Sequence, residues 1–173
     1  MAQPHDQLRR TEFSADALSE PTLPVSDSDL VDPTLTVAEA MTAAPRTCSS
    51  ASTVLEAVMI FRDADCGAIP ITDAGKPIGI LTDRDVALAI PAHEADLGRT
   101  PVGELMSKDV VTVDLDETLD VAMEKLGDHG VRRLLVVDGN DVLQGVLSWV
   151  DLVPYLSECG LGRVVSRIVE NRS

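Results

Sequence analysis

The chain contains 173 residues, of which 45% are hydrophobic but only 2% aromatic, and its formal net charge at pH 7 is −15. A surface this acidic repels phosphate backbones and anionic lipid, so nucleic acid and membrane are poor partners, and an anionic small ligand needs a locally positive site. No apolar stretch approaches the ~18 residues of a membrane span, and no basic segment followed by an apolar run marks a signal peptide.

The segment Met1–Pro33 carries seven acidic residues against two arginines, with Ser, Thr and Pro scattered through it. No hydrophobic periodicity persists there, so the composition predicts a flexible acidic N-terminal tail. The alternative is an arm that docks on a partner subunit. Its anchors would be Phe13, Leu18, Leu23 and Leu30.

After this tail, helix and strand patterns alternate. Thr36 and Glu39 form a capping-box pattern that starts a short helix, and Asp73–Lys76 reads as a turn between two strands. Hydrophobic spacing sets the remaining elements. In order we predict a helix over 36–41, an extended piece over 46–48, a helix over 53–63, strands over 68–72 and 77–81, a helix over 83–90 and a linker over 91–99.

The same pattern then returns 65 residues later, so that Met106 matches Met41 and Asp138 matches Asp73. One extra residue enters the turn at Gly139, after which Gly145 matches Gly79. A fixed-period repeat indicates one supersecondary unit used twice, with each copy covering the apolar face of the other. The second copy predicts a helix over 102–106, an extended piece over 110–113, a helix over 117–127, strands over 133–137 and 142–147 and a helix over 149–156.

The last segment, 158–173, predicts an amphipathic helix. Its apolar stripe consists of Val164, Val165, Ile168 and Val169. Such a stripe must pack on the body of the protein or on another chain, and from it we expect a homodimer.

The motif GAIPITD followed by GKPIGILTDRDV, and its counterpart GVRRLLVVD followed by QGVLSWVDL, resemble the cystathionine-β-synthase (CBS) domain. Two such units in tandem resemble a Bateman module, like small bacterial two-CBS proteins and the regulatory insert of inosine-monophosphate dehydrogenase. The resemblance implies an α+β fold of two β-α-β-β-α repeats related by an approximate two-fold axis. The implied units are repeat 1 over 34–90, the linker over 91–99 and repeat 2 over 100–157.

The resemblance also implies a function. It is that of a non-catalytic regulatory module that binds adenosine-containing ligands of the AMP, ADP or ATP class between the repeats and signals to a partner protein. No obligatory cofactor is expected. Two alternatives stay open, namely an S-adenosylmethionine sensor and a structural or stress-related interaction module that binds no nucleotide.

Each repeat ends its second strand in a hydroxyl residue followed three positions later by an aspartate: Thr82 and Asp85, then Ser148 and Asp151. A helix that begins there offers N–H groups and a positive dipole end to phosphate, and an aspartate offers acceptor oxygens to ribose hydroxyls. Arg84 adds positive charge in repeat 1. The same spacing is also an ordinary helix cap, so a purely structural role stays open.

The resemblance places adenine against the start of the first and second strands of each repeat. In repeat 1 the matching residues are Thr47, Cys48, Gly67, Ala68, Ile69 and Pro70. In repeat 2 they are Thr112, Val113, Arg132, Arg133 and Leu134. These residues are otherwise plain strand residues, and core packing is the alternative role of Ile69 and Leu134.

Repeat 2 departs from this pattern, because Val150 stands where repeat 1 has Arg84. Its phosphate charge would then have to come from Arg132 and Arg133, which otherwise serve as solvated strand-edge charges. Trp149 is bulky enough to fill or roof the second pocket. We therefore expect the better site in repeat 1.

The three cysteines, Cys48, Cys66 and Cys159, form no CxxC motif, and the three histidines have no metal-binding spacing. We therefore expect no metal site, no catalytic residues and reduced thiols in a cytoplasmic protein. Cys48 and Cys66 lie near the mouth of the first site, either in a redox role or, as is commoner, as inert thiols.

Overall fold

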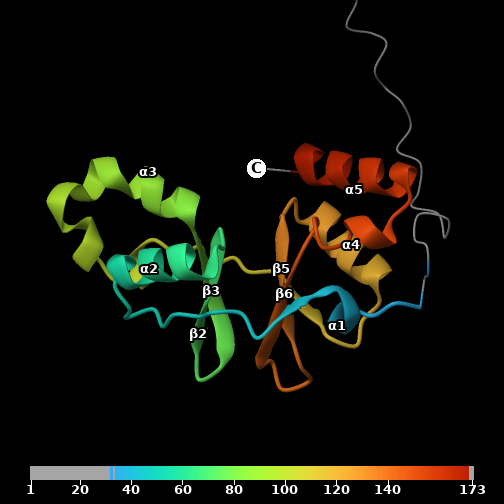
Figure 1. The fold of residues 1–173 in the computed structure, drawn as a ribbon, viewed down its shortest axis with the longest axis horizontal. Coiled ribbons are helices and arrows are strands. Elements are labelled where there is room, and N and C mark those ends of the chain that lie inside the picture. The colour runs from blue at the N-terminus through green and yellow to red at the C-terminus, as the bar shows by residue number, and fades with distance from the viewer. Residues whose placement is uncertain (1–31, 33, 172–173) are drawn as a thin grey trace, which may run out of the picture.

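Two β-sheets stand side by side at the centre of the molecule, and the helices lie on their outer sides (Figure 1). The structure is a computed structural model that describes residue 32 and residues 34–171. The predicted tail Met1–Pro33, with its four candidate anchor residues, therefore lies outside the described residues, apart from Asp32. The mixed architecture confirms the predicted α+β class.

Repeat 1 contains the two-stranded sheet. Its elements are α1 (Val37–Ala40), β1 (Thr42–Ala43), α2 (Val54–Ala64), β2 (Ala68–Asp73), β3 (Lys76–Thr82), α3 (Asp83–His93) and η1 (Glu94–Arg99). The predicted capping box is present, since Thr36 N donates to Glu39 Oε2 at 2.8 Å. The β2–β3 turn is also as predicted, with the positive φ values of Ala74 (48°) and Gly75 (81°) that a tight two-residue hairpin needs.

Repeat 2 contributes most of the four-stranded sheet, whose strand order is β1-β6-β5-β4. Its elements are η2 (Val102–Glu104), β4 (Thr112–Asp114), α4 (Leu119–Asp128), β5 (Arg133–Val137), β6 (Leu143–Ser148), η3 (Val153–Tyr155) and α5 (Glu158–Glu170). β4 runs parallel to β5, and β6 runs antiparallel to it.

Three sequence predictions differ from the structure. The predicted helix over 149–156 is wrong, because Pro154 has no N–H to continue a helix and only turns and η3 form there. The predicted extended piece over 46–48 forms no named strand, and only Cys48 makes a single bridge to Ile71. The predicted linker over 91–99 is helical, since α3 continues to His93 and η1 follows.

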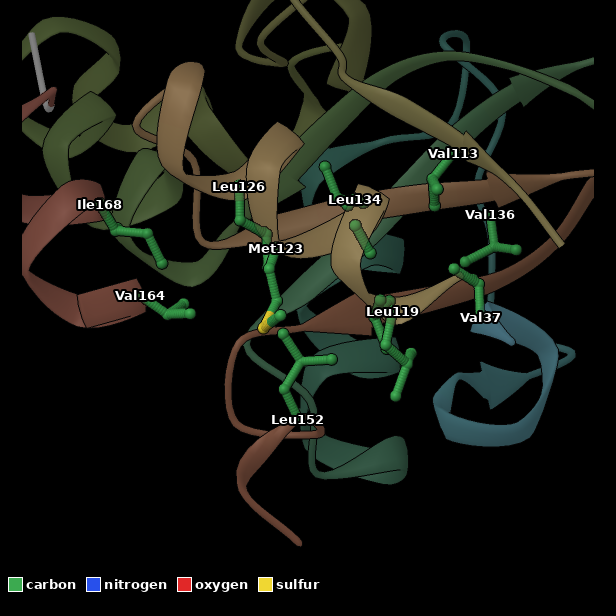
Figure 2. Packing of buried hydrophobic residues seen from close by; sticks show 12 residues of the cluster. Val37, Val113, Leu119, Met123, Leu126, Leu134, Val136, Leu152, Val164 and Ile168 are labelled. Carbon is green, nitrogen blue, oxygen red and sulfur yellow. The ribbon is translucent and has the colours of Figure 1, made fainter. Parts of the chain in front are cut away.

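The two repeats exchange the segments that lie upstream of α2 and α4, residues 36–43 and 101–108, which we call the leading segments. Val37 is buried in the core of repeat 2, beside Leu119 and Val136 (Figure 2). Val102 is buried reciprocally in the core of repeat 1. The backbone bonds match as well, with Val37 N donating to Glu117 O and Val102 N to Ser52 O, each at 2.8 Å. Each repeat therefore completes the other.

The C-terminal helix α5 packs on α4 of the same chain (Figure 1). Val164 and Ile168 are each only 5% exposed in the core of repeat 2, whereas Val169 is 65% exposed. The predicted stripe is thus covered on its inner side by the body of the protein. None of the helices within residues 34–171 has the length and apolar character that a bilayer crossing requires.

Candidate functional site

A cavity of about 370 Å³ lies where the end of β3 meets the first strand region of repeat 2. We call it cavity A. Repeat 1 contributes Gly67, Ile80, Thr82, Asp83 and Arg84. Repeat 2 contributes Ser107, Asp109, Val110, Val111, Val131, Arg132, Arg133 and Leu135. The exchange of leading segments creates this cavity, since Ile80 and Ser107 bond each other through both backbone groups at 2.9 Å.

Three arginines give cavity A its electrostatic character. Arg84 comes from the first turn of α3, and Arg132 and Arg133 come from the start of β5. Among the described residues, none of these three guanidinium groups has a hydrogen-bond or ion-pair partner. Asp83 and Asp109 are the opposing charges. Three positively charged side chains without bonding partners therefore line one cavity of an otherwise acidic protein. This arrangement suits an anionic ligand.

The backbone at the start of α3 is already hydrogen-bonded within the chain. Thr82 N donates to Asp85 Oδ2 at 2.8 Å, Arg84 N to Asp83 Oδ1 at 2.8 Å and Asp85 N to Thr82 Oγ1 at 3.2 Å. The free N–H groups expected from the sequence are thus occupied. Attraction for a phosphate in cavity A comes instead from the arginine side chains.

Asp85 and Asp151 both act as helix-type caps. Asp85 Oδ2 accepts from Thr82 Oγ1 at 2.6 Å as well as from Thr82 N, and Asp151 Oδ2 accepts from Ser148 N at 2.7 Å. Within the described chain, the Oδ1 atom of each carboxylate makes no hydrogen bond. Each aspartate therefore holds its turn with one oxygen, and of the two only Asp151 lines a cavity, where its other oxygen can accept from a ligand.

The second cavity, cavity B, has a volume of about 450 Å³ and is related to cavity A by the internal repeat. Repeat 1 contributes Thr42, Ala43, Ala44, Pro45, Arg46, Ala64, Asp65, Cys66, Gly67 and Ala68. Repeat 2 contributes Arg133, Val146, Ser148 and Asp151. Its positive groups are Arg46 and Arg133, so of the two arginines that the sequence predicted here, Arg133 lines this cavity and Arg132 does not. Trp149 packs against the core of repeat 2 and does not roof this cavity.

The structure groups the predicted residues across the repeats and not within one repeat. Thr82 and Arg84 lie with Arg132 and Arg133 in cavity A, and Ser148 and Asp151 lie with Gly67 and Ala68 in cavity B. The reason is the exchange of leading segments, which brings the strand region of one repeat to the β3 or β6 end of the other.

Several predicted residues line neither cavity. Thr47 and Cys48 line an outer hollow of about 560 Å³ beside cavity B, and Thr112 lines one of about 470 Å³ beside cavity A. The side chains of Ile69, Val113 and Leu134 are buried in the two cores, and Pro70 is buried in β2. Asp85 also lines neither cavity, although the three residues before it line cavity A.

Cys48 is a buried thiol, and burial raises its pKa, with the nearby Glu56 carboxylate adding to the effect. A raised pKa keeps this thiol protonated, which lowers its reactivity. Cys66 lines cavity B and is also unpaired.

Sequence reasoning missed the cavity residues that lie in the leading segments or directly after them, namely Ser107 and Val111 in cavity A and Thr42 and Arg46 in cavity B. The available signal was the repeat itself. Residues 42 and 46 match residues 107 and 111, so one lining residue predicts its counterpart. The exchange between repeats was not visible in either copy alone.

Comparison with known families finds the CBS domain twice in this chain, over residues 37–92 and 102–158. The CBS domain-containing protein YhcV of Bacillus subtilis is 35% identical over 133 residues, which cover 76% of this chain and 94% of that protein.

Several solved structures share the fold at more than 25% identity, among them two that contain ligands or metal ions. The CBS domain pair of protein MJ0100, in complex with 5′-methylthioadenosine and S-adenosyl-L-methionine, has a TM-score of 0.62 and 26% identity and covers 70% of this chain and 95% of that one. Hypoxic Response Protein I with two coordinated zinc ions has a TM-score of 0.62 and 28% identity and covers 70% of this chain and 99% of that one. Among the described residues here, no three His, Cys, Asp or Glu side chains are placed to hold a metal ion.

Proposed function

The chain belongs to the CBS domain family, with two such domains in tandem, and from that premise we propose that it senses adenosine-containing ligands in cavities A and B. We assign ligand binding and regulation to this protein, not catalysis. We place this activity in the cytoplasm, where three unpaired cysteines stay reduced.

One observation carries the proposal: Arg84, Arg132 and Arg133, all without partners in the described chain, line one cavity of about 370 Å³ in a protein of net charge −15. Guanidinium groups without an ion-pair partner repel one another, and an anion bound between them reduces this repulsion. The ligand we propose for cavity A is therefore a nucleotide with a 5′-phosphate, of the AMP, ADP or ATP class.

Cavity B supports a second candidate ligand class. It balances Arg46 and Arg133 against Asp65 and Asp151, so its charged groups are equal in number. A neutral or zwitterionic adenosine derivative suits this balance better than a polyphosphate does. The complex of the MJ0100 domain pair with 5′-methylthioadenosine and S-adenosyl-L-methionine supports the same choice.

The test is a thermal-shift panel of AMP, ADP, ATP, S-adenosylmethionine and 5′-methylthioadenosine. A ligand that binds only the native state stabilises it by about 2.7 kcal/mol at ~100 times its Kd. We expect Arg84→Gln to reduce the shift with AMP and to leave the shift with 5′-methylthioadenosine unchanged. Arg99→Gln is the matched control, because Arg99 is exposed and lines neither cavity. A panel with no stabilising ligand would instead favour an interaction module without a nucleotide.

We also propose that the output of this sensor passes through protein contacts, first of all a homodimer. Leu55 and Met59 of α2 are 57% and 46% exposed, and Leu88 of the neighbouring α3 is 66% exposed. The residues of repeat 2 that match Leu55 and Met59 are Asp120 and Glu124. Repeat 1 is therefore apolar at positions where its own copy is acidic, which supports burial of this face against a second copy of the chain.

A further inference from the structure

We propose that Arg133 serves both cavities, so that anionic ligands in cavity A and cavity B compete for one guanidinium and the cavities do not fill independently. This inference rests on the proposed function, because it concerns ligands in the same two cavities.

Arg133 and Gly67 are the two residues that line both cavities. In the ladder between β5 and β6, Arg133 is paired with Ser148, so its backbone lies beside cavity B. A Cβ atom built on Gly67 would lie 3.6 Å from Nη2 of Arg133 and 3.6 Å from Oδ2 of Asp83. The guanidinium of Arg133 therefore extends from repeat 2 to repeat 1, to the point where the cavities adjoin.

The internal repeat does not supply a second such group. The residues that match Arg132 and Arg133 in repeat 1 are Gly67 and Ala68. Neither carries charge, and Gly67 leaves open the space into which the guanidinium extends. The two cavities related by the repeat thus share one positively charged side chain, that of Arg133. Its guanidinium has no bonding partner among the described residues.

A guanidinium pairs with one phosphate in the bidentate geometry that gives the strongest contact. A first anion that takes Arg133 leaves the second cavity with less positive charge and adds a like charge nearby. The first anion therefore lowers the affinity for the second, and by linkage the effect is mutual. An uncharged adenosine derivative does not engage the guanidinium as a counter-ion, so it fills the two cavities independently.

Single-cavity variants make this testable by calorimetry with AMP and with 5′-methylthioadenosine. Val110→Trp blocks cavity A and leaves B open, and Ala43→Trp blocks cavity B and leaves A open. In both backgrounds Arg133→Gln should lower the affinity for AMP about tenfold, because one charge-assisted hydrogen bond is lost. The control Arg132→Gln should lower the affinity for AMP only in the Ala43→Trp background, because Arg132 lines cavity A and not cavity B. Binding of 5′-methylthioadenosine should not change.

The parent protein completes the experiment. We expect its second AMP to bind about tenfold more weakly than AMP binds the corresponding single-cavity variant. Loss of AMP affinity in only one background, or a parent isotherm equal to the sum of the two single-cavity isotherms, contradicts the inference alone. A parent protein that binds 5′-methylthioadenosine but not AMP contradicts both the inference and the nucleotide proposed for cavity A. One that binds neither contradicts the proposed sensing of adenosine-containing ligands as a whole. Melting curves verify that the Trp variants fold. If Val110→Trp does not fold, Ser107→Trp replaces it, and if Ala43→Trp does not fold, Thr42→Trp replaces it, since both positions are exposed and line the same cavities.

Discussion

At the scale of single residues, two glycines set how closely the repeats approach each other. Gly79 in β3 faces Met106 of the opposite leading segment, and Gly145 in β6 faces Met41 in the equivalent way. A Cβ atom on Gly79 would lie 2.6 Å from Sδ of Met106 and 2.9 Å from the carbonyl oxygen of Ser107. No side chain fits there unless the leading segment moves, and that segment forms part of cavity A.

We expect Gly79→Ala to lower the free energy of unfolding by about 1–3 kcal/mol, because overpacking forces backbone and methionine to shift. The matched control is Gly139→Ala, since a Cβ atom on Gly139 would meet nothing within 4 Å. Urea unfolding of both variants measures the difference. Equal stability of the two variants would show that the leading segment is not tightly held.

Residues of the site differ in how far the sequence predicts them. Thr82 was found because it ends a strand in a pattern that occurs twice, and Arg84 because it adds positive charge two residues later. Ile69 and Leu134 were included because the family resemblance places adenine at the start of their strands, β2 and β5, but their side chains are buried in the two cores. Ser107 and Val111 were missed, because their contact with repeat 1 depends on tertiary packing and not on local pattern.

At the scale of elements, α5 shows what helical spacing predicts and what it does not. The stripe of Val164 and Ile168 predicted a helix that needs cover, and the cover is α4 of the same chain. Arg167 pairs with Asp128, and Asn171 Nδ2 donates to Gly127 O at 2.8 Å, so polar contacts fix the same interface. The spacing does not identify the partner of this helix. Because Val164 and Ile168 are buried within the chain, they do not support a dimer through this stripe.

We expect Ile168→Ala to destabilise the protein by about 2–5 kcal/mol, the range for truncation of a large buried side chain. Val169→Ala, one residue further along the same helix, should change stability by less than about 0.5 kcal/mol because Val169 is exposed. Thermal or urea unfolding compares the two variants. A small effect of Ile168→Ala would mean that α5 adds little to the core of repeat 2.

The remaining element-level errors have local causes. Pro154 ends what hydrophobic spacing alone had extended into a helix over 149–156. The first strand of repeat 1 forms at Thr42–Ala43, where it pairs with β6 of repeat 2. Its position was not predicted, because β6 lies more than 100 residues away along the chain. Such long-range pairing leaves no trace in a short window of sequence.

At the scale of the whole molecule, the two repeats are alike in their interiors and unlike on their outer helices. Repeat 2 carries α5 on its helical side, whereas α2 of repeat 1 keeps Leu55 and Met59 exposed. The sequence repeat predicts the common fold. It also shows this difference directly, because Asp120 and Glu124 stand at the matching positions.

We expect the protein to be a dimer in light scattering, with twice the 18.4 kDa mass of one chain. The double substitution Leu55→Asp with Met59→Glu, which introduces the residues that repeat 2 has at these positions, should give a monomer that keeps its fold. Val169→Glu, on the exposed side of α5, is the control and should remain dimeric. A monomeric parent protein, or a double variant that stays dimeric, would rule out this face as the interface.

The central claim is that each ligand cavity is built jointly by both repeats, and amide chemical shifts measured by NMR during a titration with AMP test it most directly. We predict that the amides of Thr82 and Arg84 in repeat 1 shift together with those of Val111 and Arg132 in repeat 2, because all four residues line cavity A. Shifts confined to one repeat, or confined to the outer hollow around Thr47 and Met59, would contradict the account.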